Sequence, residues 1–240
     1  MSARGPAGDR PGKVAEWVAR DLVHDIATRR LPPGSKLPAE ADLITRYGVS
    51  RPSLREALRI LEGHGLIVMK PGPGGGPVVS NLDTSDYART STFYFHVLGV
   101  TLRDLAESRR ILDPVFARIA AEQRDPVVIE RIERHLASLA EADSADEAIA
   151  FHDALSCGTG NMILDLFAGA LQMLYIERTQ SALSPGDLET SRQHHIAIAE
   201  AILAGDGDRA ESLMRYHTDG LVQDVLDRFP DRVDEVIAWS

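Results

Sequence analysis

The stretch Ser35–Val79 reads SKLPAEADLITRYGVSRPSLREALRILEGHGLIVMKPGPGGGPVV, and it decides the fold of the first third of the chain. A short helix is predicted to begin near Leu37-Pro38, because a proline is tolerated in a first turn, where the N–H it lacks would be unpaired. Gly48 follows the apolar residues of this helix, at a position where a helix C-terminus favours positive φ. The pattern therefore predicts a short helix that ends in a tight turn.

A second helix is predicted directly after this turn. Ser50 is placed to cap it, because its hydroxyl can accept a free backbone N–H two or three residues on. Leucines recur at i, i+4 and i+7, which gives the helix one buried face. A β-prone hairpin with the tip PGPGGG follows at 66–80. Two short helices, a turn and a small hairpin form the layout of a winged helix-turn-helix, a module that reads DNA.

The exposed side of the second helix carries residue types suited to DNA. Arginine near the start of a recognition helix bonds two acceptors of guanine, and serine hydroxyls hold phosphates. Glycines at a hairpin tip let the backbone approach a groove closely. The alternative is an amphipathic helix with a solvated basic side, which the turn, the cap and the hairpin disfavour. The predicted DNA-binding residues are Ser50, Arg51, Ser53, Arg55, Lys70, Gly74 and Gly75.

The segment LPAEADLITRYGVSRPSLREALRILEGHGLI resembles the N-terminal domain of GntR-family transcription regulators. The resemblance implies base or phosphate contacts from the serines and arginines named above, and a wing tip at 74–76 in the minor groove. One position departs from the family pattern. An arginine often follows the Pro-x-Glu of the first helix, and here that position is Ala41. We therefore expect the operator to differ at the corresponding base step.

Charge is divided unequally along the 240 residues, whose formal net charge is −10. Residues 1–80 hold 12 Lys and Arg against 8 Asp and Glu, whereas residues 81–240 hold 14 against 28. The front of the chain is therefore expected to meet phosphate, and the acidic remainder is not. No signal peptide is expected from the polar, Gly- and Pro-rich residues 1–12, and the sequence has no apolar run of the ~20 residues that cross a bilayer. With a single cysteine, it is predicted to be cytoplasmic.

From residue 81 onward the sequence is rich in Ala, Leu, Glu and Arg and shows helical periodicity. Breaks that contain Gly or Pro divide it into separate helical segments. Helices are predicted at 87–98, 102–123, 126–141, 145–157, 161–182, 187–204 and 207–228. The fold class is therefore mainly α, a winged helix-turn-helix followed by an antiparallel α-helical bundle. The predicted parts are a disordered arm at 1–12, a DNA-binding domain at 13–80, a linker and connecting helix at 81–101, and a helical effector-binding and dimerisation domain at 102–230.

Three histidines occupy the apolar faces of three separate predicted helices, where leucine would be expected: His152, His195 and His217. A single histidine on such a face is usually a hydrogen-bonded core residue. Three that point into one bundle can meet and hold a divalent metal such as Zn or Ni. His194 points about 100° away from its neighbour on a helix, so we expect it to face solvent or a partner.

The segments ESRRILDPVFARIAAE, FHDALSCGTGN and HHIAIAEAILAGDGDRAESLMRYH are similar to the FCD effector domain of the FadR subfamily of GntR regulators. That resemblance implies a metal on the three histidines and on an aspartate one turn before His152, where this chain has Ala148. The resemblance also implies that Arg109 binds a carboxylate of the effector. The alternative is an ion pair between Arg109 and Asp113 on the same helix, worth ~0.3–0.5 kcal/mol. Asn161 is a second effector-site candidate, although its position after a Gly-containing break favours a helix cap over contact with an effector.

Together these features predict a metabolite-responsive DNA-binding regulator that acts as a homodimer on a pseudo-palindromic operator. By resemblance, the default is a repressor released by a small carboxylate bound near the three histidines. A metal-ion sensor and, less favoured, a metal-dependent hydrolase remain as alternatives. An enzyme is not expected, because the sequence shows no carboxylate base beside the histidines and an enzyme has no use for a DNA module.

Overall fold

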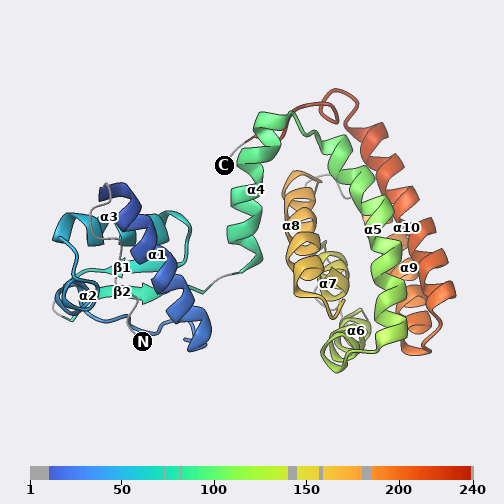
Figure 1. Ribbon diagram of the computed structural model, residues 1–240. Helices are drawn as coiled ribbons and strands as arrows, with labels where there is room; N and C mark the ends of the chain where they lie inside the picture. Colours follow the sequence, from blue (N-terminus) through green and yellow to red (C-terminus); the bar gives the residue numbers. More distant parts are fainter. Residues whose placement is uncertain are drawn as a thin grey trace. The chain divides into compact units, whose positions relative to one another are not determined.

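The computed structural model describes residues 11–72, 74–81, 83–139, 145–156, 159–179 and 185–238. The chain divides into two compact units, Met1–Leu82 and Asp83–Ser240. Figure 1 follows the elements of both units from α1 to α10. Of the arm predicted at 1–12, residues 1–10 lie outside the described part, and the last two residues belong to the first helix.

The first unit contains three helices and a two-stranded antiparallel sheet in its described residues. Its elements are α1 (Pro11–Thr28), α2 (Glu40–Tyr47), α3 (Arg51–Gly63), β1 (Ile67–Lys70) and β2 (Gly76–Val79). In the hairpin, Ile67 pairs with Val79 and Lys70 with Gly76. Helix α1, which the sequence patterns did not delimit, packs against α3 and completes the core of this unit.

The turn between α2 and α3 forms as its residues predict. Gly48 adopts φ 63° and its N–H bonds Ile44 O, while the Ser50 hydroxyl accepts the N–H of Ser53. The predicted start of the first helix near Leu37 was wrong, since α2 begins at Glu40. Leu37 instead donates its N–H to Pro77 O in an extended segment beside β2, which holds it out of the helix.

The second unit is built from helices in its described residues, which confirms the predicted helical C-terminal domain. They are α4 (Thr84–Leu98), α5 (Leu102–Gln123), α6 (Pro126–Ser138), α7 (Ala145–Ser156), α8 (Met162–Thr179), α9 (Pro185–Leu203) and α10 (Gly207–Arg228). α5 packs along α10, and α4 packs against α8 (Figure 1). The helix ends predicted at 140–141, 157 and 180–182 lie outside the described residues.

Caps and core side chains fix these helices in place. Thr101 and Asp104 form a reciprocal capping box at the start of α5, which satisfies two otherwise unpaired N–H groups. Phe151, Ile198 and Met214 are fully buried where α7, α9 and α10 meet. The unit continues past its predicted end at residue 230, because Ile237 is buried and donates its N–H to Val100 O. No described helix is long and apolar enough to span a bilayer.

Candidate functional site

The predicted DNA-binding residues of the first unit lie at the start of α3 and at the hairpin tip. Arg51 and Arg55 are exposed and one helical turn apart. Nε of Arg55 lies 3.4 Å from a carboxylate oxygen of Glu40, an exposed pair that is worth little and can open to release the arginine. The capped N-terminus of α3, with Ser50 and Ser53, presents the positive end of a helix dipole, which favours a phosphate.

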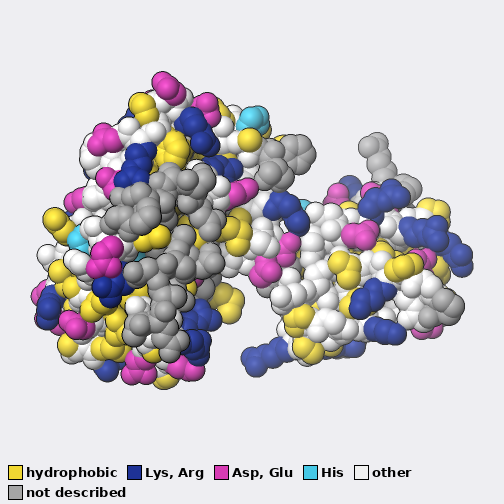
Figure 2. Space-filling model, turned by 180° about the vertical axis from the view of Figure 1, so that it is seen from behind, with side chains coloured by type: hydrophobic (Ala, Val, Ile, Leu, Met, Phe, Trp, Pro, Cys, Tyr) yellow, Lys and Arg dark blue, Asp and Glu magenta, His cyan; other side chains and the backbone are white. Residues whose placement is uncertain are grey.

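The hairpin tip is a tight, glycine-dependent loop. Lys70, Gly74 and Gly75 are exposed, and Nζ of Lys36 donates to Gly74 O at 3.0 Å, which ties the tip to the preceding segment. A Cβ at Gly75 would lie 2.2 Å from Lys70 O, so only glycine fits there. Figure 2 shows Lys and Arg side chains spread over the visible face of this unit. Such a surface matches the charge of a nucleic acid backbone.

In the second unit, the three predicted histidines meet in the core. His152 on α7, His195 on α9 and His217 on α10 are 7%, 1% and 2% exposed. Nε2 of His217 lies 3.1 Å from Nε2 of His152 and 3.2 Å from Nε2 of His195. Together the three histidines form a group that could hold a metal ion. Nitrogen ligands at about 2.1 Å around a tetrahedral ion lie about 3.4 Å apart, which is close to the two distances from His217.

The expectation that no carboxylate stands beside the histidines was wrong. Oδ2 of Asp113, on α5, lies 3.3 Å from Nδ1 of His152. The resemblance to FCD domains places this acid one turn before His152 on the same helix, at Ala148, whose side chain lies outside the described part. Packing of α5 against α7 supplies the acid from a different helix instead. In metal sites, a carboxylate commonly accepts the N–H of the ring nitrogen that does not bind the metal, and so fixes the tautomer and orientation of the imidazole.

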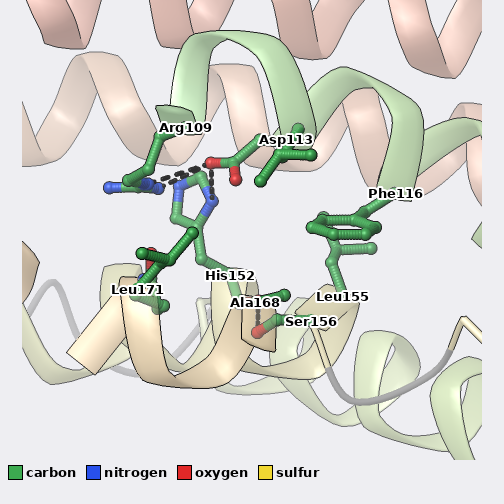
Figure 3. Close-up of a pocket in the computed structure, with 10 residues that line it drawn as sticks. Arg109, Asp113, Phe116, His152, Leu155, Ser156, Ala168 and Leu171 are labelled. Carbon is green, nitrogen blue, oxygen red and sulfur yellow. Dashed lines mark hydrogen bonds and ion pairs between the residues drawn. The ribbon is translucent and has the colours of Figure 1, made fainter. Parts of the chain in front are cut away.

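Arg109 shares this carboxylate and is itself buried. Its Nε and Nη2 both donate to Oδ2 of Asp113, at 3.1 and 2.8 Å, and its guanidinium lies 4.5 Å from the ring centre of Tyr175. Figure 3 shows Asp113 between Arg109 and His152. The Arg109–Asp113 pair predicted as an alternative from the sequence is therefore formed. Its side chains are only 7% and 14% exposed, so it is not the weak surface pair that was expected. This arrangement leaves Arg109 on the wall of a pocket.

Burial and charge set the protonation of the cluster. Burial alone raises the pKa of Asp113, but Arg109 and the hydrogen bond to His152 outweigh it and lower that pKa to about 2. Burial lowers the pKa of each triad histidine, and the other cationic groups nearby lower it further. The imidazoles are therefore neutral near pH 7, which is the form that binds a metal.

Two histidines outside the predicted triad also belong to this region. His194 was expected to face solvent or a partner, but its Nδ1 lies 3.3 Å from Nδ1 of His217. Its neighbour in the chain, His195, stacks on Phe151 with ring centres 4.2 Å apart. His135 on α6 is buried against the same phenylalanine at 5.0 Å. Sequence spacing gave no reason to expect His135 here, since it is a lone histidine on its helix.

The other effector-site candidate lies apart from this cluster. Asn161 is exposed, and its Oδ1 accepts the N–H of Ile163 at 3.0 Å, so it caps α8. It does not line the pocket that Arg109, Asp113 and His152 share with apolar side chains of α5, α7 and α8 (Figure 3). That pocket has a volume of about 10 Å³, which is room for about one water.

Comparisons with known proteins agree with both units. The family model "Bacterial regulatory proteins, gntR family" matches residues 14–75, and the FCD domain model matches residues 104–220. The HTH-type transcriptional regulator LutR of Bacillus subtilis (strain 168) is 27% identical over 212 residues, which cover 84% of this chain and 95% of that protein. The HTH-type transcriptional repressor NanR of Cronobacter sakazakii is 28% identical over 222 residues, covering 85% and 82%.

A solved structure shows the same fold. Streptococcus agalactiae GntR superposes with a TM-score of 0.68 at 22% identity, over 87% of this chain and 99% of that one. A winged helix-turn-helix followed by a helical domain with a buried polar pocket defines a DNA-binding transcription regulator, and the matched relatives are regulators rather than enzymes. The chain belongs to the GntR family, in the group whose members carry an FCD domain.

Proposed function

We propose that this protein is a cytoplasmic, homodimeric repressor that leaves its operator when a small carboxylate binds beside the histidine triad. The observation that carries the proposal is the buried guanidinium of Arg109, which lines one pocket together with His152 of the triad. A guanidinium binds a carboxylate through two parallel hydrogen bonds. A metal on the triad would offer a second, Lewis-acidic contact for an oxygen of the same effector.

The small size of the pocket links binding to a change in packing. An organic acid is much larger than the single water for which the pocket has room. It therefore binds only if the lining side chains move and if its carboxylate competes with Asp113 for Arg109. Such a ligand prefers an arrangement of α5, α7 and α8 different from the one described here. That preference is the differential affinity that allosteric release of DNA requires.

We propose Zn or Ni as the metal, held by Nε2 atoms of His152, His195 and His217. The close approach of three neutral, buried imidazoles supports this, because each can present a ring-nitrogen lone pair to an ion once the proton on Nε2 of His217 moves to Nδ1. Asp113 would act as the acceptor that orients His152, as carboxylates do for ligating histidines elsewhere.

An exposed apolar end of α8 supports the homodimer. Met162 and Ile163 are 85% and 78% exposed, and Leu164, Leu166 and Phe167 are each more than a third exposed. A cluster of large apolar side chains on a surface usually marks a contact with another molecule. A second copy of the chain is the partner that a two-fold operator requires.

A metal-sensing repressor is the second candidate function. The small pocket favours it, because an organic acid enters that pocket only with rearrangement, whereas an ion on the triad needs no room there. In this version, the triad closes on the ion and the ion itself is the effector.

The two candidates separate in one experiment on the full-length protein. Operator binding is followed by fluorescence anisotropy while small hydroxy, keto and sugar acids are added to zinc-loaded protein and to protein treated with a chelator. Release by an acid supports the carboxylate proposal, and loss of that release on chelation shows that the metal takes part. Release by zinc alone supports the sensor. If neither the acids nor zinc changes operator binding, both candidate functions are contradicted.

A further inference from the structure

His194 contacts a histidine on another helix, although its place in the chain suggested that it faces solvent or a partner. It precedes His195, yet its Nδ1 lies 3.3 Å from Nδ1 of His217, with the two rings nearly perpendicular at 79°. Tyr216 also packs edge-on against His194, with ring centres 5.3 Å apart. His217 is fully enclosed whereas His194 is half-buried. Two ring nitrogens at this distance share one proton, so one of them donates and the other accepts.

The direction of that bond follows from Asp113, at the other end of the cluster. Its carboxylate pairs with Arg109, which always carries its proton, so the carboxylate is ionised and can only accept. Nδ1 of His152 must then be the donor toward Asp113, which leaves Nε2 of the neutral His152 as an acceptor. Nε2 of His217 lies 3.1 Å from that acceptor. Without a cation between them, His217 therefore carries its proton on Nε2.

Metal binding requires the other form of His217. A ligating Nε2 must offer its lone pair, so the proton has to reside on Nδ1. In the metal-free form Nδ1 of His217 accepts from His194, and in the ligating form it donates to His194. A side chain that partners His217 in both forms must be able both to donate and to accept. Imidazole can do so, and a carboxylate or an ammonium cannot.

We propose that His194 is a positioning residue that supports the metal-ligating tautomer of His217, by accepting its Nδ1–H, and thereby raises the affinity of the triad for a divalent metal. This inference rests on the metal-binding part of the proposed function. Outer partners of ligating histidines fix the tautomer and ring orientation in this way, and their loss typically weakens metal binding by about 10–100-fold. In the triad, Asp113 plays this role for His152, while Nδ1 of His195 has no hydrogen-bond partner among the described residues.

The test measures zinc affinity of the full-length protein by competition with a chromophoric chelator. His194→Phe keeps an aromatic ring but cannot bond Nδ1 of His217, so we expect zinc to bind about tenfold more weakly or worse. His194→Gln can both donate and accept, so its affinity should stay within a few-fold of the wild type. His194→Glu can only accept, which favours the ligating form and should tighten binding. His24→Phe, an equivalent change on α1 of the first unit, is the matched control and should change nothing.

The tautomer itself provides a second readout that does not depend on bound metal. In metal-free wild-type protein, ¹⁵N shifts should place the His217 proton on Nε2, and in His194→Glu they should place it on Nδ1. This measurement separates tautomer control from the added negative charge of the glutamate, which attracts zinc from any nearby position.

Each result bears on a definite part of the inference. Wild-type zinc affinity in His194→Phe, or the same His217 tautomer in wild type and His194→Glu, overturns it while leaving the metal proposal intact. A wild-type protein that takes up no zinc overturns the metal proposal and this inference together, without touching DNA binding. If His194→Phe loses its helical circular dichroism signal, it has not folded. The zinc affinities and His217 tautomers of His194→Gln and His194→Glu then test the inference.

Discussion

Oδ2 of Asp113 lies 3.3 Å from Nδ1 of His152 and at the same time accepts two N–H bonds from Arg109. One carboxylate oxygen thus connects the arginine that is the effector-site candidate with the histidine triad that is the candidate metal site. Any group that takes Arg109 from Asp113 also changes the acceptor of His152. The two candidate sites are therefore one site, and this coupling can be tested.

Asp113→Asn should destabilise the protein strongly. The substitution keeps the size of the side chain but leaves Arg109 buried without an opposite charge, and breaking such a pair costs roughly 3–5 kcal/mol. The free energy of unfolding from urea denaturation measures the effect. Asp234→Asn is the matched control, because Asp234 also accepts two bonds from an arginine but is 67% exposed. An equal loss in both variants would show that burial of the first pair is unimportant.

Arg51→Ala and Arg55→Ala should each weaken operator binding by about 1–3 kcal/mol and relax base preference. Both side chains are exposed at the start of α3, so the melting temperature should not change. Anisotropy titrations with the operator and with a scrambled duplex measure affinity and specificity. Arg59→Ala, one turn further along the exposed side, serves as the control. Normal operator affinity in the double variant would exclude α3 as the recognition helix.

Lys70→Ala should act differently from the arginine substitutions. A lysine beside the hairpin tip is expected to meet a phosphate, so its loss weakens binding to all duplexes alike. The slope of log affinity against log salt concentration should fall by about 1. Salt titrations on the operator and on the scrambled duplex make the comparison. A loss confined to the operator would mean that Lys70 reads a base instead.

Zinc should stabilise the folded protein, because an ion that binds only the native state adds about 2.7 kcal/mol at 100 times its dissociation constant. His217→Ala should abolish this increment, since Nε2 of His217 is within 3.2 Å of the Nε2 atoms of both other triad members. Thermal melts with and without zinc give the result. His24→Ala, on α1, should keep the full increment. An increment that persists in His217→Ala would place the zinc elsewhere.

Local sequence patterns were sufficient for the helix-turn-helix and for most of the helical domain. Gly48 and Ser50 end one helix and cap the next through contacts within a few residues, so spacing alone predicts them. Helical periodicity, together with the Gly- and Pro-containing breaks, likewise predicted the bounds of α5 and α10, and inward positions on three helices predicted the meeting of the histidine triad. Leu37 was misjudged because its N–H pairs with Pro77, forty positions later in the chain.

Only the tertiary structure decided which groups surround the triad. Spacing along α7 pointed to Ala148 for a carboxylate, while packing of α5 supplied Asp113 from another helix. The angle of a residue on its own helix suggested that His194 faces outward, but α10 covers that side and places His217 against it. Periodicity fixes which face of a helix is buried. It does not fix the register in which two helices pack, and a register shift of one turn, about 5.4 Å, moves a side chain out of hydrogen-bond reach.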